Sequence, residues 1–286
     1  MQPWRDRSGH VSALKLIVFL ALFLPGAWTT LGLALHALGA RPLTEAIHQT
    51  GLWAIRLLLL SLAVTPLRRV LQWPKLIMVR RMIGVAAFAY AAAHLALYAA
   101  DQAFDLRRVA SEIALRLYLT IGFATLLLLA ALAATSTEGM IRRLGGRAWR
   151  LLHRLAYAAG FLALTHYFMQ SKLGLGEPLL MTGLFAWLMG HRLIGRLAGE
   201  RWPAWSLAGL SLLLGLAIAG GQAAYFHFTI GADPVRVLAA NLAWTVGCRS
   251  SWAIVVLGLA LTAAGGLRGH FVRRPPTRLA PLSAAR

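Results

Sequence analysis

The chain alternates between long apolar stretches and short segments rich in arginine, a pattern typical of a protein that crosses a membrane several times. A helix of about 20 apolar residues is long enough to span a hydrocarbon layer about 30 Å thick. On this basis the sequence predicts eight spanning helices, over residues 14–35, 51–67, 82–100, 117–134, 149–169, 178–194, 204–222 and 251–267. The expected fold class is therefore all-α, a polytopic transmembrane helix bundle.

Lys and Arg are unevenly divided between the two ends of these helices. The N-terminal segment, three loops and the C-terminal tail together carry 21 of the 29 Lys and Arg residues. With the acids subtracted, that side has a net charge of +18 and the other side +2. Because basic loops stay in the cytoplasm, both termini are expected to be cytoplasmic.

Composition narrows the function further. Of the 286 residues, 59% are hydrophobic and 13% charged, whereas soluble domains carry about 25% charged residues. The net charge of +20 would suggest nucleic acid in a soluble chain, but here the arginines flank apolar spans and are expected to face lipid, so no nucleic-acid partner is expected. The single cysteine, Cys248, excludes an internal disulfide, a covalently attached haem and an iron–sulfur cluster.

Histidines within the apolar stretches are the candidate chemistry, because an ionisable residue inside a span is costly and imidazole is a common haem ligand. The stretch 149–169 reads WRLLHRLAYAAGFLALTHYFM and contains His153 and His166. With cytoplasmic termini, this stretch and 82–100 both run outward, so His94 and His166 lie at a similar depth in the outer half. They could bind one iron axially from opposite sides, as a low-spin b-type haem requires.

His153 is harder to interpret. It lies near the cytoplasmic face, and 13 residues of ideal helix turn it about 140° away from the face that carries His166. A second haem there is left open, and contact with a quinone or flavin is the alternative, with Arg80 and Arg81 nearby. The remaining histidines on that side are His10, His191 and His270.

Arg56 lies about a turn and a half inside 51–67, close to the depth expected of His94 and His166. A guanidinium there costs a few kcal/mol unless it is paired or reaches the headgroups. A propionate of the outer haem would pair with it, because arginine binds carboxylates through two hydrogen bonds. The hypothesis places Arg56 on a propionate and His48 in the same outer vestibule, and lipid anchoring is the alternative.

Several segments resemble a known family. They are AIHQTG with Arg56 following, LLLLSLAVTPLRR, VRRMIG, AAAHLALY, RLYLTIG and TSTEGM–RRLGG–W–LLHRLAYAAGFLALTHY, and they cover residues from about 14 to 195. The chain is similar here to the haem-binding membrane subunits of bacterial periplasmic methionine-sulfoxide reductases, the MsrQ or YedZ family. The transmembrane domain of that family is related to those of ferric reductases and NADPH oxidases.

The resemblance implies a b-type haem protein of the bacterial inner membrane, an electron-transfer subunit without catalytic residues of its own. It implies His94, His153 and His166 as haem-ligand positions. The expected acceptor is a periplasmic molybdopterin sulfoxide reductase. The expected donors are the quinone pool or a cytosolic flavin reductase, with FMN as a further cofactor and Arg80 and Arg81 near the donor site.

The sequence also departs from the family. The family core has six spans, expected here over 1–200, and this chain adds a two-span extension over 201–270 and a basic disordered tail over 271–286. Where the family often has Arg-Pro-Tyr, residues 116–118 read Arg-Leu-Tyr. Two other functions stay open: a quinone-linked b-type cytochrome or ferric reductase with another acceptor, and a transporter that uses histidines as proton relays. The broken helices and inverted repeats expected of many transporters are not evident in the sequence, which argues against the transporter.

Overall fold

The computed structural model describes residues 2–5, 9–171, 174–198, 205–243 and 249–271, with side chains as far as 265. Cys248 and all but the first residue of the expected basic tail lie outside the described residues. Within them the chain is helical, and the β structure consists of one isolated bridge between Arg5 and Val11.

The helices follow one another with short connections. They are α1 (Ala13–Ala21), α2 (Leu24–Ala34), α3 (Pro42–Val70), the 3-10 helix η1 (Pro74–Met78), α4 (Arg80–Asp101), α5 (Leu106–Leu115), α6 (Leu117–Ala134), α7 (Glu138–Leu152), α8 (Leu155–Gln170), α9 (Gly176–Leu197), α10 (Trp205–Ile230), α11 (Pro234–Leu242) and α12 (Ser250–Phe271).

Five helical segments of the described chain are long and apolar enough to cross a membrane. They are Ala13–Ala34, Pro42–Val70, Arg80–Asp101, Leu117–Ala134 and Trp205–Ile230, and Ser250–Gly265 is a shorter apolar helix. These segments indicate an all-helical, multi-pass membrane protein. The expected count of eight spans and the expected side of the termini are not confirmed by them.

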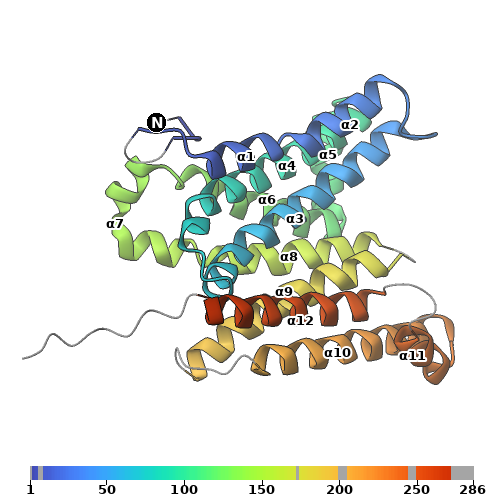
Figure 1. The fold of residues 1–286 in the computed structure, drawn as a ribbon. Helices are drawn as coiled ribbons and strands as arrows, with labels where there is room; N and C mark the ends of the chain where they lie inside the picture. The colour runs from blue at the N-terminus through green and yellow to red at the C-terminus, as the bar shows by residue number, and fades with distance from the viewer. Residues whose placement is uncertain (1, 6–8, 172–173, 199–204, 244–248, 272–286) are drawn as a thin grey trace, which may run out of the picture.

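Four helices form a ring at the centre of the bundle (Figure 1). In this ring α3 packs on α4, α4 on α6, α6 on α8, and α8 on α3, so that α4 and α8 are diagonal to each other. Each helix contributes buried apolar side chains to one shared core, among them Leu58, Ile83, Leu129 and Ala163. Because lipid tails are as apolar as these side chains, close van der Waals packing stabilises the ring.

A second layer of helices covers one side of the ring. Helix α9 packs on α3 and α8, and α10 and α12 pack on α9 and on each other. The short helices α5 and α11 lie at one end of the bundle and α7 lies at the other, and we call these the α5 end and the α7 end (Figure 1).

The stretch predicted as one helix over 149–169 is two helices in the structure. His153 is the C-terminal cap of α7 and Arg154 precedes α8, and the two residues form a turn. The cause lies in α7, whose arginines favour the polar boundary of a membrane over its hydrocarbon. The apolar helix α8 therefore begins only at Leu155.

Arg192 ties three helices together around a proline. Pro66 lies inside α3 and has no N–H, so the carbonyl of Leu62, four residues earlier, lacks its usual helical partner. The Nη2 of Arg192, on α9, donates to that carbonyl at 2.6 Å. The same guanidinium donates to the carbonyl of Leu188 at 2.8 Å and lies 5.2 Å from the ring centre of Tyr157, on α8.

Candidate haem-binding site

His94 on α4 and His166 on α8 face each other across the diagonal of the ring. Their ring centroids are 6.2 Å apart and their planes are inclined at 84°. The sequence paired these two histidines by depth alone, and the structure brings them together. Their role as iron ligands stays a prediction.

Each of the two imidazoles is held by a backbone carbonyl of the neighbouring helix. The Nδ1 of His94 lies 2.8 Å from the carbonyl oxygen of Ile47 on α3, and the Nδ1 of His166 lies 2.7 Å from that of Tyr118 on α6. A carbonyl oxygen only accepts, so Nδ1 carries the proton in both rings. The lone pair is thus on Nε2, the arrangement found in most metal-binding histidines.

A glycine lies one helical turn after each of these carbonyls. A Cβ added at Gly51 would lie 2.8 Å from the Nδ1 of His94, and one at Gly122 would lie 2.8 Å from that of His166. Both distances are too short for real contacts. The two glycines therefore leave the space in which the imidazoles rest, and the two halves of the site repeat one local arrangement.

The spacing of the rings fits a haem iron between them. An imidazole nitrogen binds a metal at about 2.0–2.1 Å and lies about 1.1 Å from its ring centre, so two axial imidazoles have centroids about 6.2–6.4 Å apart. The observed 6.2 Å agrees with this. A haem needs only axial ligands from the protein, and the two available Nε2 atoms match that need.

His153 lies apart from this pair, at the other end of α8 from His166. Its ring stacks on Trp149 with centroids 3.9 Å apart, and its Nδ1 lies 3.1 Å from the carbonyl of the same residue. The Nε2 is 3.4 Å from the Oγ of Ser136. His191 is buried on α9 beside Trp187, whereas His153 is at the end of α7. The side chain of His270 is not described.

Arg80 and Arg81 point to different neighbours. Arg81 pairs with Glu138 of α7 at 2.6 Å. Arg80 lies close enough to His153 and Arg192 to act on both electrostatically. Of the two arginines, Arg80 is therefore the one associated with His153.

Arg81 also lines a long groove between the N-terminal helices and α4. The groove has a volume of about 1820 Å³. Its walls are mostly apolar, and the charged residues among them are Lys15, Arg81, Glu138 and Arg142. The charged side chains of α7 and of the first turn of α4 place the polar part of the groove at the α7 end.

Arg56 has a partner that sequence reasoning missed. Its guanidinium pairs with Glu177 at the start of α9 and lies 5.0 Å from the ring centre of Trp53. The hydroxyl of Tyr167 donates to the other oxygen of Glu177 at 3.3 Å. Glu177 is 121 residues away in sequence, so no local pattern could have indicated it. His48 is exposed and follows Ile47 directly.

The fold and the facing imidazoles agree with a recognised class of protein. Residues 50–165 match the family described as ferric reductase like transmembrane component, and this range includes His94 and ends one residue before His166. The chain thus contains a ferric-reductase-like transmembrane domain. Within that class it belongs to the MsrQ family, the heme-binding subunits of the protein-methionine-sulfoxide reductase system.

Three relatives show the extent of the match. MsrQ of Rhodospirillum rubrum is 42% identical over 191 residues, which cover 66% of this chain and 89% of that protein. MsrQ of Xanthomonas campestris pv. campestris is 43% identical over 208 residues, covering 69% and 94%. MsrQ of Xanthomonas axonopodis pv. citri is 42% identical over 207 residues, covering 69% and 93%. No solved structure matches the chain. The resemblance seen in the sequence is confirmed, and about a third of the chain lies outside these alignments.

Proposed function

We propose that this chain holds a b-type haem between His94 and His166 and passes electrons across the bacterial inner membrane to the catalytic subunit of its system, a periplasmic molybdenum-cofactor enzyme. The observation that carries the proposal is the pair of imidazoles, each fixed by a carbonyl and spaced for one iron. The proposed topology has eight spans and both termini in the cytoplasm, which makes the α5 end periplasmic.

The haem would supply an iron that takes up and releases one electron. The protein's own part is to fix the two imidazoles, to exclude water with the apolar ring of helices, and to set the local charge. Arg56 is proposed to contact a haem propionate while it pairs with Glu177, because a guanidinium has five donors and one carboxylate does not use all of them. His48, next to Ile47, belongs to the same outer vestibule.

The donor side is proposed at the α7 end. His153 and Arg80 lie together there, and the groove beside Arg81 combines an apolar wall with a charged end. A quinone has the matching shape, an apolar tail with a polar ring, and FMN has a phosphate that suits arginine. A cytosolic flavin reductase or the quinone pool would then deliver electrons at this end. A second haem at His153 is the alternative use of this side chain.

The ligand assignment is tested by absorption spectroscopy of the purified protein. His94→Ala and His166→Ala are each expected to abolish the low-spin spectrum or convert it to high spin, whereas His227→Ala, exposed near the C-terminal end of α10, should not alter it. An unchanged spectrum in either of the first two variants would refute the pairing. The haem-to-protein ratio gives the number of haems.

The donor side is tested by comparing two reductants. His153→Ala is expected to slow reduction by a quinol or by a flavin reductase and to leave reduction by dithionite unchanged. If both reductants act at the wild-type rate, His153 is a structural residue. Delivery of electrons to a purified methionine-sulfoxide reductase separates the proposed function from that of a cytochrome or ferric reductase with another acceptor.

A further inference from the structure

The two halves of the site share their backbone arrangement but differ in one side chain. The carbonyl that holds His94 belongs to Ile47, and the one that holds His166 belongs to Tyr118. The ring of Tyr118 lies beside that of His166, with centroids 6.4 Å apart and planes inclined at 30°. The residue that holds His166 therefore places an aromatic ring beside that imidazole, whereas the residue that holds His94, Ile47, has an aliphatic side chain.

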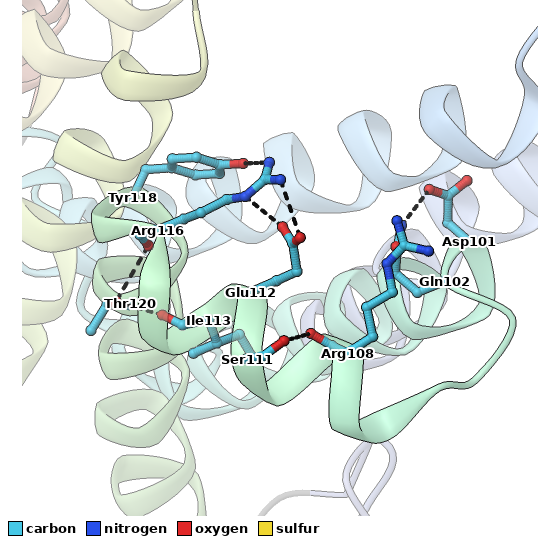
Figure 2. A network of polar contacts seen from close by, with 9 residues as sticks. All are labelled: Asp101, Gln102, Arg108, Ser111, Glu112, Ile113, Arg116, Tyr118 and Thr120. Carbon is cyan, nitrogen blue, oxygen red and sulfur yellow. Dashed lines mark hydrogen bonds and ion pairs between the residues drawn. The ribbon is translucent and has the colours of Figure 1, made fainter.

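Tyr118 lies at the junction of α5 and α6, beside the polar side chains of that junction (Figure 2). Its hydroxyl accepts a hydrogen bond from the Nη1 of Arg116 at 3.3 Å, and the Nε of Arg116 pairs with Glu112 of α5 at 2.5 Å. The hydroxyl of Thr120 donates to the carbonyl of Ile113 at 2.6 Å and fixes the same junction. The bond to Tyr118 and the charge of Glu112 raise the pKa of Arg116, which stays a cation.

The α5–α6 corner, residues 104–118, exposes apolar side chains ahead of the candidate span Leu117–Ala134. Three of them are 67–83% exposed: Phe104, Leu106 and Leu115. Arg107 and Arg108 are exposed between them, and Val109 is the buried residue of α5. Exposed apolar groups together with arginine are typical of protein–protein interfaces.

We propose that electrons leave the site through Tyr118 and that the catalytic subunit of the system docks on the α5–α6 corner to receive them. This rests on the proposed function, and it adds the exit residue and the docking surface. A bound haem would supply one electron, with the oxidation of ferrous to ferric iron balanced by one-electron reduction of the acceptor, and no proton or bond would be transferred. Tyr118 is a positioning residue, which fills the space between His166 and the surface.

The exit is tested with variants that spare the carbonyl of residue 118. Tyr118→Leu removes the ring and should slow oxidation of the dithionite-reduced protein by the sulfoxide reductase about tenfold, since electron transfer depends steeply on positioning. Tyr118→Phe keeps the ring and should retain the rate. Phe161→Leu is the matched control, because it removes an exposed aromatic ring from α8, the helix that carries His166, and should also retain the rate. The absorption spectrum and reduction potential should stay at wild-type values in all three.

The docking surface is tested without relying on electron transfer. In a Cys248→Ser background, Leu115→Cys is labelled with a maleimide polymer, and Val235→Cys on α11, 72% exposed at the same end, is the control. The label on residue 115 should raise the Kd of the reductase about tenfold, which is 1.4 kcal/mol, and that on residue 235 should not. Unmodified Leu115→Cys should be protected from maleimide by the reductase.

The outcomes separate this inference from the proposed function. A wild-type protein without a haem spectrum would refute the function itself. A wild type that delivers electrons, with Tyr118→Leu equally fast and spectrally unchanged, would refute the exit and leave the function standing. Protection of residue 115 by lipid vesicles alone would show that α5 lies on the membrane and would refute the docking surface. Loss of haem in Tyr118→Leu would contradict the expected wild-type spectrum and would refute the exit, because the ring would then hold the site together instead of leading out of it.

Discussion

The hydrogen bond between Arg192 and the carbonyl of Leu62 should matter only because Pro66 is present. Without an N–H at residue 66, the carbonyl has no partner within the helix, and Arg192 supplies one at 2.6 Å. Arg192→Met keeps most of the side-chain stem and removes all donors. Pro66→Ala restores the missing N–H and makes the arginine dispensable for this carbonyl.

The expected size follows from the contacts of Arg192. Leaving a buried acceptor unsatisfied costs about 1–3 kcal/mol, although hydrogen bonds between membrane helices average nearer 0.6 kcal/mol. The cation–π contact with Tyr157 adds about 0.5–2 kcal/mol, and it is lost with or without Pro66. Arg192→Met should therefore cost about 1–4 kcal/mol, of which about 1 kcal/mol or more disappears in the Pro66→Ala background.

A double-mutant cycle measures this difference. The wild type, both single variants and the double variant are unfolded reversibly in mixed micelles, and the four free energies of unfolding give the coupling between the two sites. A coupling near 1 kcal/mol or above is expected. Equal costs of Arg192→Met in both backgrounds would refute the reasoning and would leave the cation–π contact as the main contribution of Arg192.

The remaining predictions concern the haem. Gly51→Ala and Gly122→Ala should each weaken haem affinity about 10–100-fold in titrations of the haem-free protein, because a Cβ 2.8 Å from Nδ1 displaces the imidazole. Gly84→Ala, whose Cβ would meet its nearest atom at 3.9 Å, is the control, and equal affinities would show that the imidazoles are not held as described. Arg56→Leu should lower the reduction potential or weaken haem retention, since a positive charge near the haem favours the reduced state. A wild-type reduction potential and haem occupancy in that variant would show that Arg56 serves only to pair with Glu177.

Helix positions could largely be predicted from apolar runs, because span length is imposed by the thickness of hydrocarbon. The run predicted over 117–134 has the bounds of α6, Leu117–Ala134. The short helices α5 and α11 were not expected, since helices of 10 and 9 residues give no long apolar run. The prediction of a single helix over 149–169 was wrong for its first turn, because Trp149 and Leu151 belong to α7 and not to α8.

The pairing of His94 with His166 could be predicted because depth in a membrane follows from orientation and residue count. The groups that hold them could not, since a backbone carbonyl has no sequence signature. Gly51 and Gly122 were the available signal: one begins an apolar run and the other lies within one, and a glycine there lowers helix propensity and so requires a structural reason. The partner of Arg56 depends on tertiary packing alone.

Helices α10 and α12 are connected to the candidate haem site through α3. This helix carries the carbonyl and the glycine that fix His94, and its position depends on the second layer. Leu207 of α10 packs in one buried cluster with Leu62 of α3, and Gly265 of α12 lies against Val70 at the end of α3. Both contacts are near the Arg192 bond, at the opposite end of α3 from Gly51. Helices α10 and α12 therefore brace α3 at its α7 end, while the pair of Arg56 and Glu177 joins α3 to α9 nearer the candidate haem site.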